Sequence, residues 1–297
     1  MLNISGLRLP MIGDKLVGGK VYFVDSGHAK ANDGNLGVHP DNSPLATIDG
    51  AIGMCTAANG DFIVVMPGHS ETAATQITCD VAGVSIIGVG YGQNIPAVTA
   101  HASAADCVNV TADDVYIENI RLIGAASCTA FINVAAADFT AKKVWFDGVA
   151  TPENQVTIAA GGTRFNFLEC RFESQTNGPN YGILIEAPDL DGWVVKDCIF
   201  NFHGTGLDDA GIGCSFHSPG GLVDGNVFIG MDATAVDFNS SSQANIEGII
   251  SNNLIGAGAG TANIDTLIDP GGYACINNMG TDIPTERGGY VPVTSPV

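Results

Sequence analysis

One short pattern of apolar and polar positions recurs between Val115 and Met279. Each occurrence has a few β-branched or aromatic residues, then Asn, Cys or Gly, then another apolar pair. The occurrences centre on Asn119, Gly148, Cys170, Cys198, Asn226, Asn253 and Asn278. Successive centres are 29, 22, 28, 28, 27 and 25 residues apart, a spacing typical of solenoids, in which each structural unit stacks on the next. The pattern therefore predicts one elongated domain.

Each repeat also contains a second run of β-branched and aromatic residues, which predicts a second strand. These runs lie at 131–134, 156–158, 183–185, 212–216, 235–238 and 266–268. Two or three short strands per turn of about 27 residues, separated by Gly, Asn and Asp, fit one coil of a parallel β-helix. Leucine-rich repeats are shorter and Leu-dominated, and helical repeats have a 3.6-residue period; the chain shows neither pattern.

Like residues recur at equivalent positions of successive coils, where stacking places them above one another. Phe172, Phe200 and Phe228 each lie two residues after a repeat centre, and we expect their rings to stack. Asn226, Asn253 and Asn278 are expected to form a ladder of amide hydrogen bonds that also satisfies the backbone of the turns. We interpret both columns as structural.

The segment before the repeats has its own pattern. Residues 20–25 read as a strand and residues 26–43 as a polar loop, while Leu45, Ile48, Ile52 and Cys55 have helical spacing after Pro44. A solenoid must cover its open end to avoid edge pairing, so we expect a helix over 44–55 to be the cap. Apolar runs at 61–71 and 84–90 then begin the stacked coils.

Composition narrows the class of protein. The chain has 297 residues, of which 45% are hydrophobic and 14% charged, so it can bury a large core and is not disordered for most of its length. Its net charge of −20 argues against binding to nucleic acid or to anionic membranes, although a cationic or calcium-rich partner stays open. Residues 1–10 lack the features of a secretory signal, so we expect no export by that route.

The eight cysteines are widely spaced and include no CxxC pair. Cys170 and Cys198 occupy one column of the repeat, where stacked strands lie about 4.8 Å apart. We expect free, buried thiols that act as small apolar side chains.

The N-terminal part carries a family resemblance. The strand that ends at Asp25, followed by PLATIDGAIG, GDFIVVMPGHSET and GVSIIGVGYG, resembles right-handed parallel β-helix proteins of the pectin-lyase-like superfamily. More narrowly, it resembles the β-helix proteins encoded among bacteriophage structural genes. The resemblance covers about residues 20–280 and implies an all-β, single-domain right-handed parallel β-helix with coils of about 22–29 residues. It does not fix the function, because the superfamily contains lyases, hydrolases, tailspikes and inert structural proteins.

Four segments follow from this organisation. Residues 1–19 form an N-terminal extension, and residues 20–60 supply the opening strand, loop and capping helix. The parallel β-helix is expected over 61–280, and 281–297 reads as an extended tail with three prolines.

The resemblance also shows which catalytic motifs to look for. Polysaccharide hydrolases of the superfamily have an Asn-Thr-Asp triplet, an adjacent Asp pair, a Gly-His-Gly and an Arg-Ile-Lys. Here only Asp208-Asp209, five residues after His203-Gly204, matches one of them. Adjacent residues of a strand face opposite ways, and this pair lies in a Gly-rich stretch, so a solvated turn is favoured over a catalytic pair.

The remaining candidates are weaker. Asp189 and Asp191 flank Leu190, His69 and Glu71 follow the Pro67-Gly68 turn, and His217 precedes a Ser-Pro-Gly-Gly stretch. The basic residues of the central coils, among which a lyase base would be found, are Arg121, Arg164, Arg171, Lys142, Lys143 and Lys196. None lies in a recognisable motif, and the chain has no metal-site spacing or phosphate-binding loop. We expect no catalytic residues, no cofactor and no metal site.

From the resemblance we expect a non-enzymatic virion structural protein of a tailed bacteriophage, assembled as a homotrimer. Only about twenty residues flank the β-helix at each end, which favours a capsid decoration or cement protein over a tailspike. The expected partners are the chain itself and, through the terminal segments, the major capsid protein, with no nucleic acid and no membrane. A tailspike-like protein that binds or degrades polysaccharide is the alternative, and an adhesin that lacks its export signal is a third.

Overall fold

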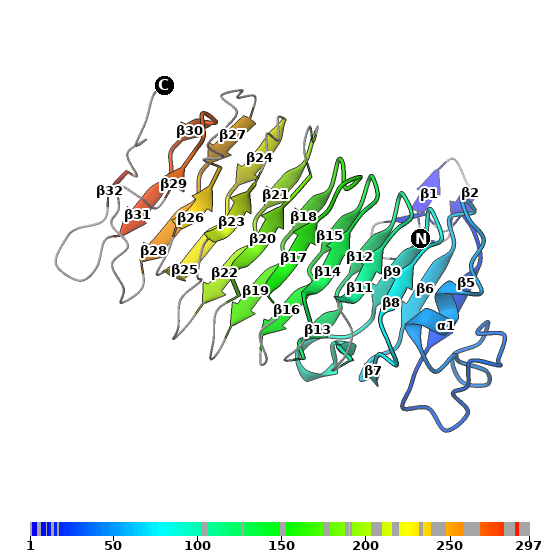
Figure 1. The fold of residues 1–297 in the computed structure, drawn as a ribbon. Helices are drawn as coiled ribbons and strands as arrows, with labels where there is room; N and C mark the ends of the chain where they lie inside the picture. Colours follow the sequence, from blue (N-terminus) through cyan, green and yellow to red (C-terminus); the bar gives the residue numbers. More distant parts are fainter. Residues whose placement is uncertain are drawn as a thin grey trace.

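The structure is a computed structural model of the chain. It describes residues 2–4, 7–9, 11–12, 15–16, 18–101, 106–125, 128–148, 153–174, 179–187, 190, 192–202, 210–215, 220–231, 234–238, 248–257, 268–281 and 289–290. These residues form a parallel β-helix, as the repeats predicted, and it is right-handed, as the family resemblance implied. Each coil passes through three sheets in turn, and Figure 1 shows the coils stacked in sequence order from β5 to β31.

The first sheet begins at the N-terminal end of the stack. Its strands, in order, are β5 (Val21–Val24), β6 (Phe62–Val65), β9 (Ser85–Gly88), β12 (Tyr116–Glu118), β15 (Thr140–Lys142), β18 (Asn166–Leu168), β21 (Val194–Lys196), β24 (Gly221–Asp224), β27 (Gly248–Ser251) and β30 (Ala274–Ile276). All neighbouring pairs among these strands are parallel.

The second sheet follows the first in each coil. It contains β7 (Ser70–Thr72), β10 (Ala97–Thr99), β13 (Arg121–Ile123), β16 (Trp145–Gly148), β19 (Arg171–Ser174), β22 (Ile199–Phe202), β25 (Val227–Met231), β28 (Leu254–Ala257), β31 (Met279–Thr281) and an antiparallel final strand, β32 (Gly289–Tyr290). The third sheet completes each coil. It contains β8 (Ile77–Cys79), β11 (Asp106–Val110), β14 (Ala130–Val134), β17 (Asn154–Ile158), β20 (Tyr181–Ile185), β23 (Ala210–Cys214), β26 (Thr234–Asp237) and β29 (Ile268–Asp269).

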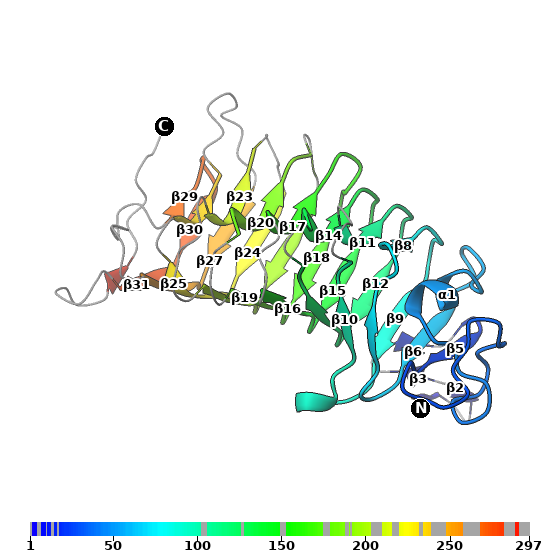
Figure 2. The same cartoon turned by 60° about the horizontal axis from the view of Figure 1, so that its bottom comes forward.

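Two short hairpins precede the stack, formed by β1 (Leu2–Ile4) with β2 (Leu7–Leu9) and by β3 (Met11–Ile12) with β4 (Lys15–Leu16). In both views they lie near the β5 end of the first sheet (Figure 2). The predicted boundaries of the extension, cap, β-helix and tail stay predictions.

A single left-handed residue turns the chain from the first sheet to the second. Its φ lies between 53° and 68° in seven successive coils, at Asn119, Lys143, Glu169, Asp197, Gly225, Asn252 and Asn277. Gly, Asn and Asp tolerate this backbone conformation best, which explains why they recur at the corner. Lys143 and Glu169 are less suited to it, and their side chains form an exposed ion pair with 3.7 Å between Nζ and Oε2.

The corner corrects two of the sequence alignments. Asn119 is itself the left-handed residue, one position before the column that holds Cys170, and Gly148 lies at the end of β16 in the second sheet. The true register pairs Arg121, Trp145, Arg171, Ile199, Val227, Leu254 and Met279. Their numbers differ by 24, 26, 28, 28, 27 and 25, a more even spacing than the sequence pattern gave. The step from Ile86 to Ile117, which includes the 3₁₀ turn η1 (Gly92–Asn94), is 31 residues and exceeds the predicted range.

The predicted phenylalanine column is confirmed and is one ring longer than expected. Phe172 and Phe200 stack with 4.4 Å between ring centroids, Phe200 and Phe228 with 4.6 Å, and Phe146 extends the stack below Phe172 at 4.5 Å. All four side chains are fully buried. Strand registry therefore places the same ring at the same point of the core in four successive coils, with Leu122 and Ile255 in the coils on either side.

The predicted asparagine ladder is also confirmed, and it continues the cysteine column. The backbone N–H of Cys198 donates to Asn226 Oδ1 at 2.9 Å, that of Asn226 to Asn253 Oδ1 at 2.9 Å, and that of Asn253 to Asn278 Oδ1 at 3.1 Å. Cys170 N–H makes the corresponding contact with Cys198 Sγ at 3.4 Å. None of the eight cysteines forms a disulfide, as predicted, and burial raises the pKa of the Cys79 thiol to about 12.

The capping helix is present but shorter than predicted. Helix α1 spans Ile48–Ile52, with Ile48, Ala51 and Ile52 buried against the stack. Thr47 caps its N-terminus by accepting a hydrogen bond from Gly50 N–H at 3.0 Å. Leu45 is extended instead of helical, because its N–H and C=O bind Phe23 and Asp25 of the first sheet.

In the part of the chain that the structure describes, no helix has the length and apolar character needed to cross a membrane.

Candidate functional site

Six of the sequence-predicted polar candidates lie outside the described residues. This applies to Asp208, Asp209 and His203, which follow β22, and to Asp189, Asp191 and His217. That none of them has a catalytic role stays a prediction. The His69 and Glu71 pair lies within the described residues.

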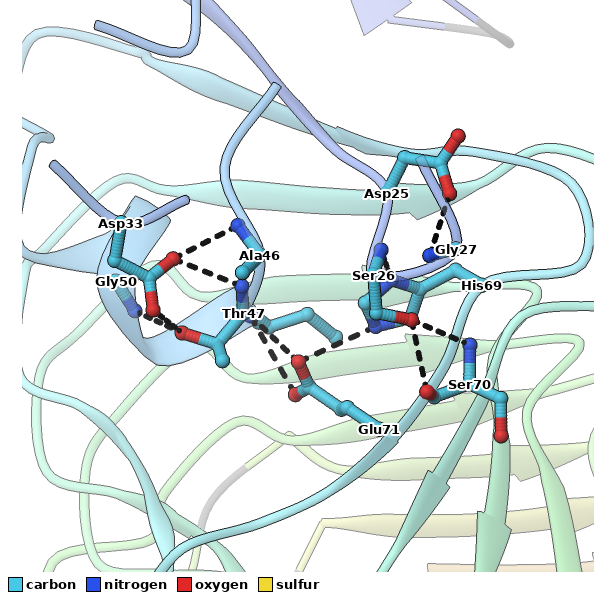
Figure 3. A network of polar contacts seen from close by, with 11 residues as sticks. Asp25, Ser26, Gly27, Asp33, Ala46, Thr47, Gly50, His69, Ser70 and Glu71 are labelled. Atoms are coloured by element: carbon cyan, nitrogen blue, oxygen red, sulfur yellow. Dashed lines mark hydrogen bonds and ion pairs between the residues drawn. The ribbon is translucent and has the colours of Figure 1, made fainter. Parts of the chain in front are cut away.

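His69 and Glu71 join three segments at the capped end of the stack (Figure 3). His69 Nδ1 accepts a hydrogen bond from Ser26 N–H at 2.9 Å, so the neutral ring carries its proton on Nε2, which lies 3.2 Å from Glu71 Oε2. Glu71 also accepts from Ile48 N–H, at 3.1 Å to Oε2. The carboxylate thus binds the first residue of α1 while the imidazole binds the loop after β5.

The surrounding contacts make this a structural latch. Ser26 Oγ donates to Ser70 C=O at 2.8 Å and accepts from Ser70 N–H at 3.0 Å, which satisfies part of the edge strand β7. Asp33 holds Ala46 N–H, Thr47 N–H and Thr47 Oγ1 within 3.0 Å. His69 is 1% exposed and Glu71 8%, so neither group is open to a substrate. The pair closes the end of the β-helix and carries no catalytic arrangement.

Glu71→Ala is expected to destabilise the cap by about 1–3 kcal/mol, because it leaves the buried Ile48 N–H without its acceptor. Glu71→Gln retains an acceptor oxygen and should cost less. Amide hydrogen exchange at Ile48, together with thermal unfolding, measures the effect. Equal protection of Ile48 in the wild type and in Glu71→Ala would contradict this role.

A second polar cluster, which the sequence analysis missed, lies on the outer face of the second sheet. Trp145 is flanked in its column by Arg121 and Arg171, whose guanidinium carbons lie 4.4 and 5.4 Å from the centroid of the Trp145 ring. In the next outward column, Asp147 pairs with Arg121, and Glu173 pairs with Arg171. Trp145 Nε1 donates to Glu173 Oε2 at 2.7 Å.

The geometry of this cluster favours stabilisation of the stack over catalysis. Each guanidinium contacts the Trp145 ring, as a cation–π contact requires, and each is neutralised by a carboxylate. Asp147 is fully buried and Glu173 is 9% exposed, so neither carboxylate is open to an acid or base role at the surface. The sequence does contain a signal for this cluster, the spacing Trp-x-Asp in one coil and Arg-x-Glu in the next. These two pairs can be recognised as equivalent only when the register of the coils is known.

Three more of the predicted basic residues, Lys143, Arg164 and Lys196, also bind carboxylates. Arg164 makes two hydrogen bonds to Asp138, at 2.7 and 2.6 Å, and Lys196 Nζ lies 2.9 Å from Asp224 Oδ2. The Arg164 pair borders a hollow of about 560 Å³ on the outer face of the first sheet, lined by Phe62, Ser85, Tyr116, Asp138 and others. The carboxylate of Asp138 is therefore already neutralised where it borders the hollow.

Asp224 is held in its ionised form by several partners. Hydrogen bonds from Lys196, Asn252 and Ser251 lower its pKa from the usual value to about 2. Because the pKa is lowered on folding, the stabilisation is present above the ordinary Asp value of about 4 and is lost as the pH falls toward 2.

Lys196→Met is expected to raise the pKa of Asp224 toward its ordinary value, since Lys196 is the strongest of these influences. A pH titration of the Asp224 carboxyl carbon by NMR measures the shift, and Lys30→Met, remote from Asp224 in an exposed loop, is the control. An unchanged titration in Lys196→Met would exclude this pairing in solution.

Within the described ranges, no group of three or more His, Cys, Asp or Glu side chains could hold a metal ion.

Comparisons with known proteins find similarity only at the level of structure. No family model and no curated protein matches the chain. Among solved structures, "Geobacillus virus E2 - ORF18" is 13% identical with a TM-score of 0.37, and the match covers 78% of this chain and 56% of that one, little more than half its length. A "Rhamnogalacturonan lyase" is 12% identical with a TM-score of 0.34, with 88% of this chain and 87% of that one covered. At these values neither name is transferred to the chain.

Proposed function

We propose that the chain is a non-enzymatic structural protein of a bacteriophage virion, a capsid decoration or cement protein that assembles as a trimer on the head. The observation that carries the non-enzymatic part is the use of its conspicuous polar groups. Arg121, Arg164 and Arg171 bind carboxylates and the asparagine column binds backbone groups, so these polar side chains are already paired with other groups of the β-helix. The phage assignment rests on the sequence resemblance of the capped N-terminal part.

A stiff body suits such a role. Ten strands of the first sheet, about 4.8 Å apart, give a stack roughly 40 Å long. Each coil is tied to the next by backbone ladders in three sheets and by the phenylalanine and asparagine columns. The terminal segments 1–19 and 281–297 are the proposed attachments to the major capsid protein.

Location in the particle tests this proposal. The chain should be found by antibody labelling and electron microscopy on the head surface of intact virions, and chains that lack residues 1–19 or 281–297 should bind depleted heads more weakly. Labelling confined to the tail would remove the decoration role.

A tailspike-like protein that binds or cleaves polysaccharide is the second candidate, favoured by the Trp145 cluster on an outer sheet face, where aromatic and charged groups occur together. Incubation with host capsule or polyuronates, followed by assays for new reducing ends or unsaturated products, tests it. Cleavage that is abolished by Asp208→Asn and retained in Asp41→Asn would contradict the non-enzymatic proposal.

A further inference from the structure

The outer face of the second sheet changes character along the stack. Arg121, Trp145 and Arg171 occupy its first outward column in β13, β16 and β19, and aliphatic side chains replace them in the coils that follow. We call this outward set the apolar patch; it consists of the exposed Ile199, Ile229, Leu254 and Met279 and the half-buried Val227. Their strands β22, β25, β28 and β31 are adjacent in the sheet (Figure 1), so the side chains form one continuous surface.

These side chains are unusually open to solvent for their size. Ile199 is 42% exposed, Ile229 39%, Leu254 49% and Met279 51%. The inward positions of the same strands, such as Phe200, Phe228 and Ile255, are fully buried. Strand alternation therefore gives β22, β25 and β28 an apolar residue on both faces, the pattern of a strand that is covered on both sides.

The patch carries no charge. The other described outward positions in β22, β25 and β28 are Asn201 and Gly256, both neutral. This is notable in a chain with 31 acidic residues and a net charge of −20. Two copies of such a chain repel each other on most approaches, and an uncharged face is where that repulsion is weakest. A cationic partner would instead be drawn to the acidic surfaces.

The size of the patch fits the core of an interface. Its five side chains expose roughly 400 Å² of apolar surface, against about 800 Å² per partner, somewhat over half of it apolar, in a standard protein interface. The patch thus supplies most of the apolar area that one side of a contact needs, and the neighbouring polar residues supply a rim.

We infer that the apolar patch is the surface through which copies of this chain associate side by side. The patches of three neighbouring copies face one threefold axis, where each patch contacts the patches of the other two copies. This deepens the proposed function by naming the surface that holds the trimer, and it rests on that assembly.

The test is the mass of the purified full chain in solution. Light scattering at micromolar concentration is expected to give an oligomer for the wild type and a monomer for Ile229→Asp/Leu254→Asp. The neutral pair Ile229→Thr/Leu254→Thr, which places β-branched strand formers at both positions, should weaken association at least tenfold even if the Asp pair fails to fold. Ile249→Thr, 42% exposed on the first sheet in the same coil as Leu254, is the matched control and should remain an oligomer.

Salt provides an independent readout. Association through an uncharged patch between acidic chains should strengthen when ionic strength rises, because salt screens the repulsion and leaves the apolar contact intact. An oligomer that dissociates as the salt concentration rises, or one that both double variants leave unchanged, would overturn the assignment of the patch without contradicting the trimer itself. A wild type that is monomeric at all concentrations would also overturn the inference. If the Thr pair then lost binding to heads, the patch would be a contact with another virion protein.

Discussion

Phe200→Ala is expected to lower the free energy of unfolding by about 3–5 kcal/mol, among the largest effects of any single substitution in the chain. Phe200 is the middle of a continuous stack, with Phe172 at 4.4 Å and Phe228 at 4.6 Å, and its side chain is fully buried. Truncation removes both stacking contacts and leaves a cavity between two coils that the backbone ladders prevent from closing.

Thermal and denaturant unfolding measure this loss. At roughly 2–4 °C per kcal/mol for a large domain, the melting temperature should fall by about 6–20 °C. Phe200→Leu fills part of the cavity and should cost less than half as much. Ile249→Ala, on the exposed face of β27 in the first sheet and outside the apolar patch, should change stability by no more than about 0.5 kcal/mol. Similar losses for Phe200→Ala and Ile249→Ala would refute the role of the stack.

Asn253→Ala is expected to cost about 3 kcal/mol or more, because it removes the centre of the amide ladder. Asn253 Oδ1 accepts from both Asn226 N–H and Asn226 Nδ2, at 2.9 and 3.0 Å, and its own Nδ2 donates to Val223 C=O and to Asn278 Oδ1. The substitution leaves several buried polar groups unpaired, each at a cost of about 1–3 kcal/mol unless water replaces the amide.

The stability of the Asn253→Asp variant is expected to depend on pH. The carboxylate would face Val223 C=O and Asn278 Oδ1 without a donor, so burial and repulsion should raise the folded-state pKa of the new carboxyl. The variant should then be most stable below the ordinary Asp pKa of about 4 and lose stability as the pH rises through the folded pKa.

Asn252→Gly is the matched control for the ladder. Asn252 precedes Asn253, is exposed and has a φ of 56°, which glycine adopts without strain. It should change stability by less than about 1 kcal/mol, apart from the loss of its hydrogen bond to Asp224. Urea unfolding between pH 3 and pH 8 measures the stability of Asn253→Ala, Asn253→Asp and Asn252→Gly against the wild type. A loss of stability in Asn253→Asp that is the same at every pH would contradict the buried ladder.

The core columns could be predicted because parallel stacking turns sequence period into spatial contact. Phe172, Phe200 and Phe228 recur at fixed distances from the repeat centres, and the same holds for the asparagines. The two early coils were misaligned because Asn119 matched the later asparagines in type, while the backbone uses it as the left-handed corner. Residue type alone does not distinguish an amide that turns the chain from one that fills the column beside the turn.

The Trp145 cluster could not be found without that register. Arg121, Trp145 and Asp147 meet because Arg121 pairs with Trp145 across the ladder. An error of one residue in the alignment moves each of these side chains to the opposite face of the sheet. The helix over 44–55 was overestimated for a related reason, since helical spacing could not reveal that Leu45 is used to extend the first sheet.

The sequence by itself determined the solenoid, the stacked aromatic and amide columns, the free thiols and the presence of a capping helix, because each depends on periodicity or local composition. Only the tertiary structure decided the register of the early coils, the pairing of each arginine with its carboxylate, the latch at His69 and Glu71, and the exposed apolar patch. Those features depend on which coil lies above which, and side chains 24 to 28 residues apart become neighbours only when the ladders fix that order.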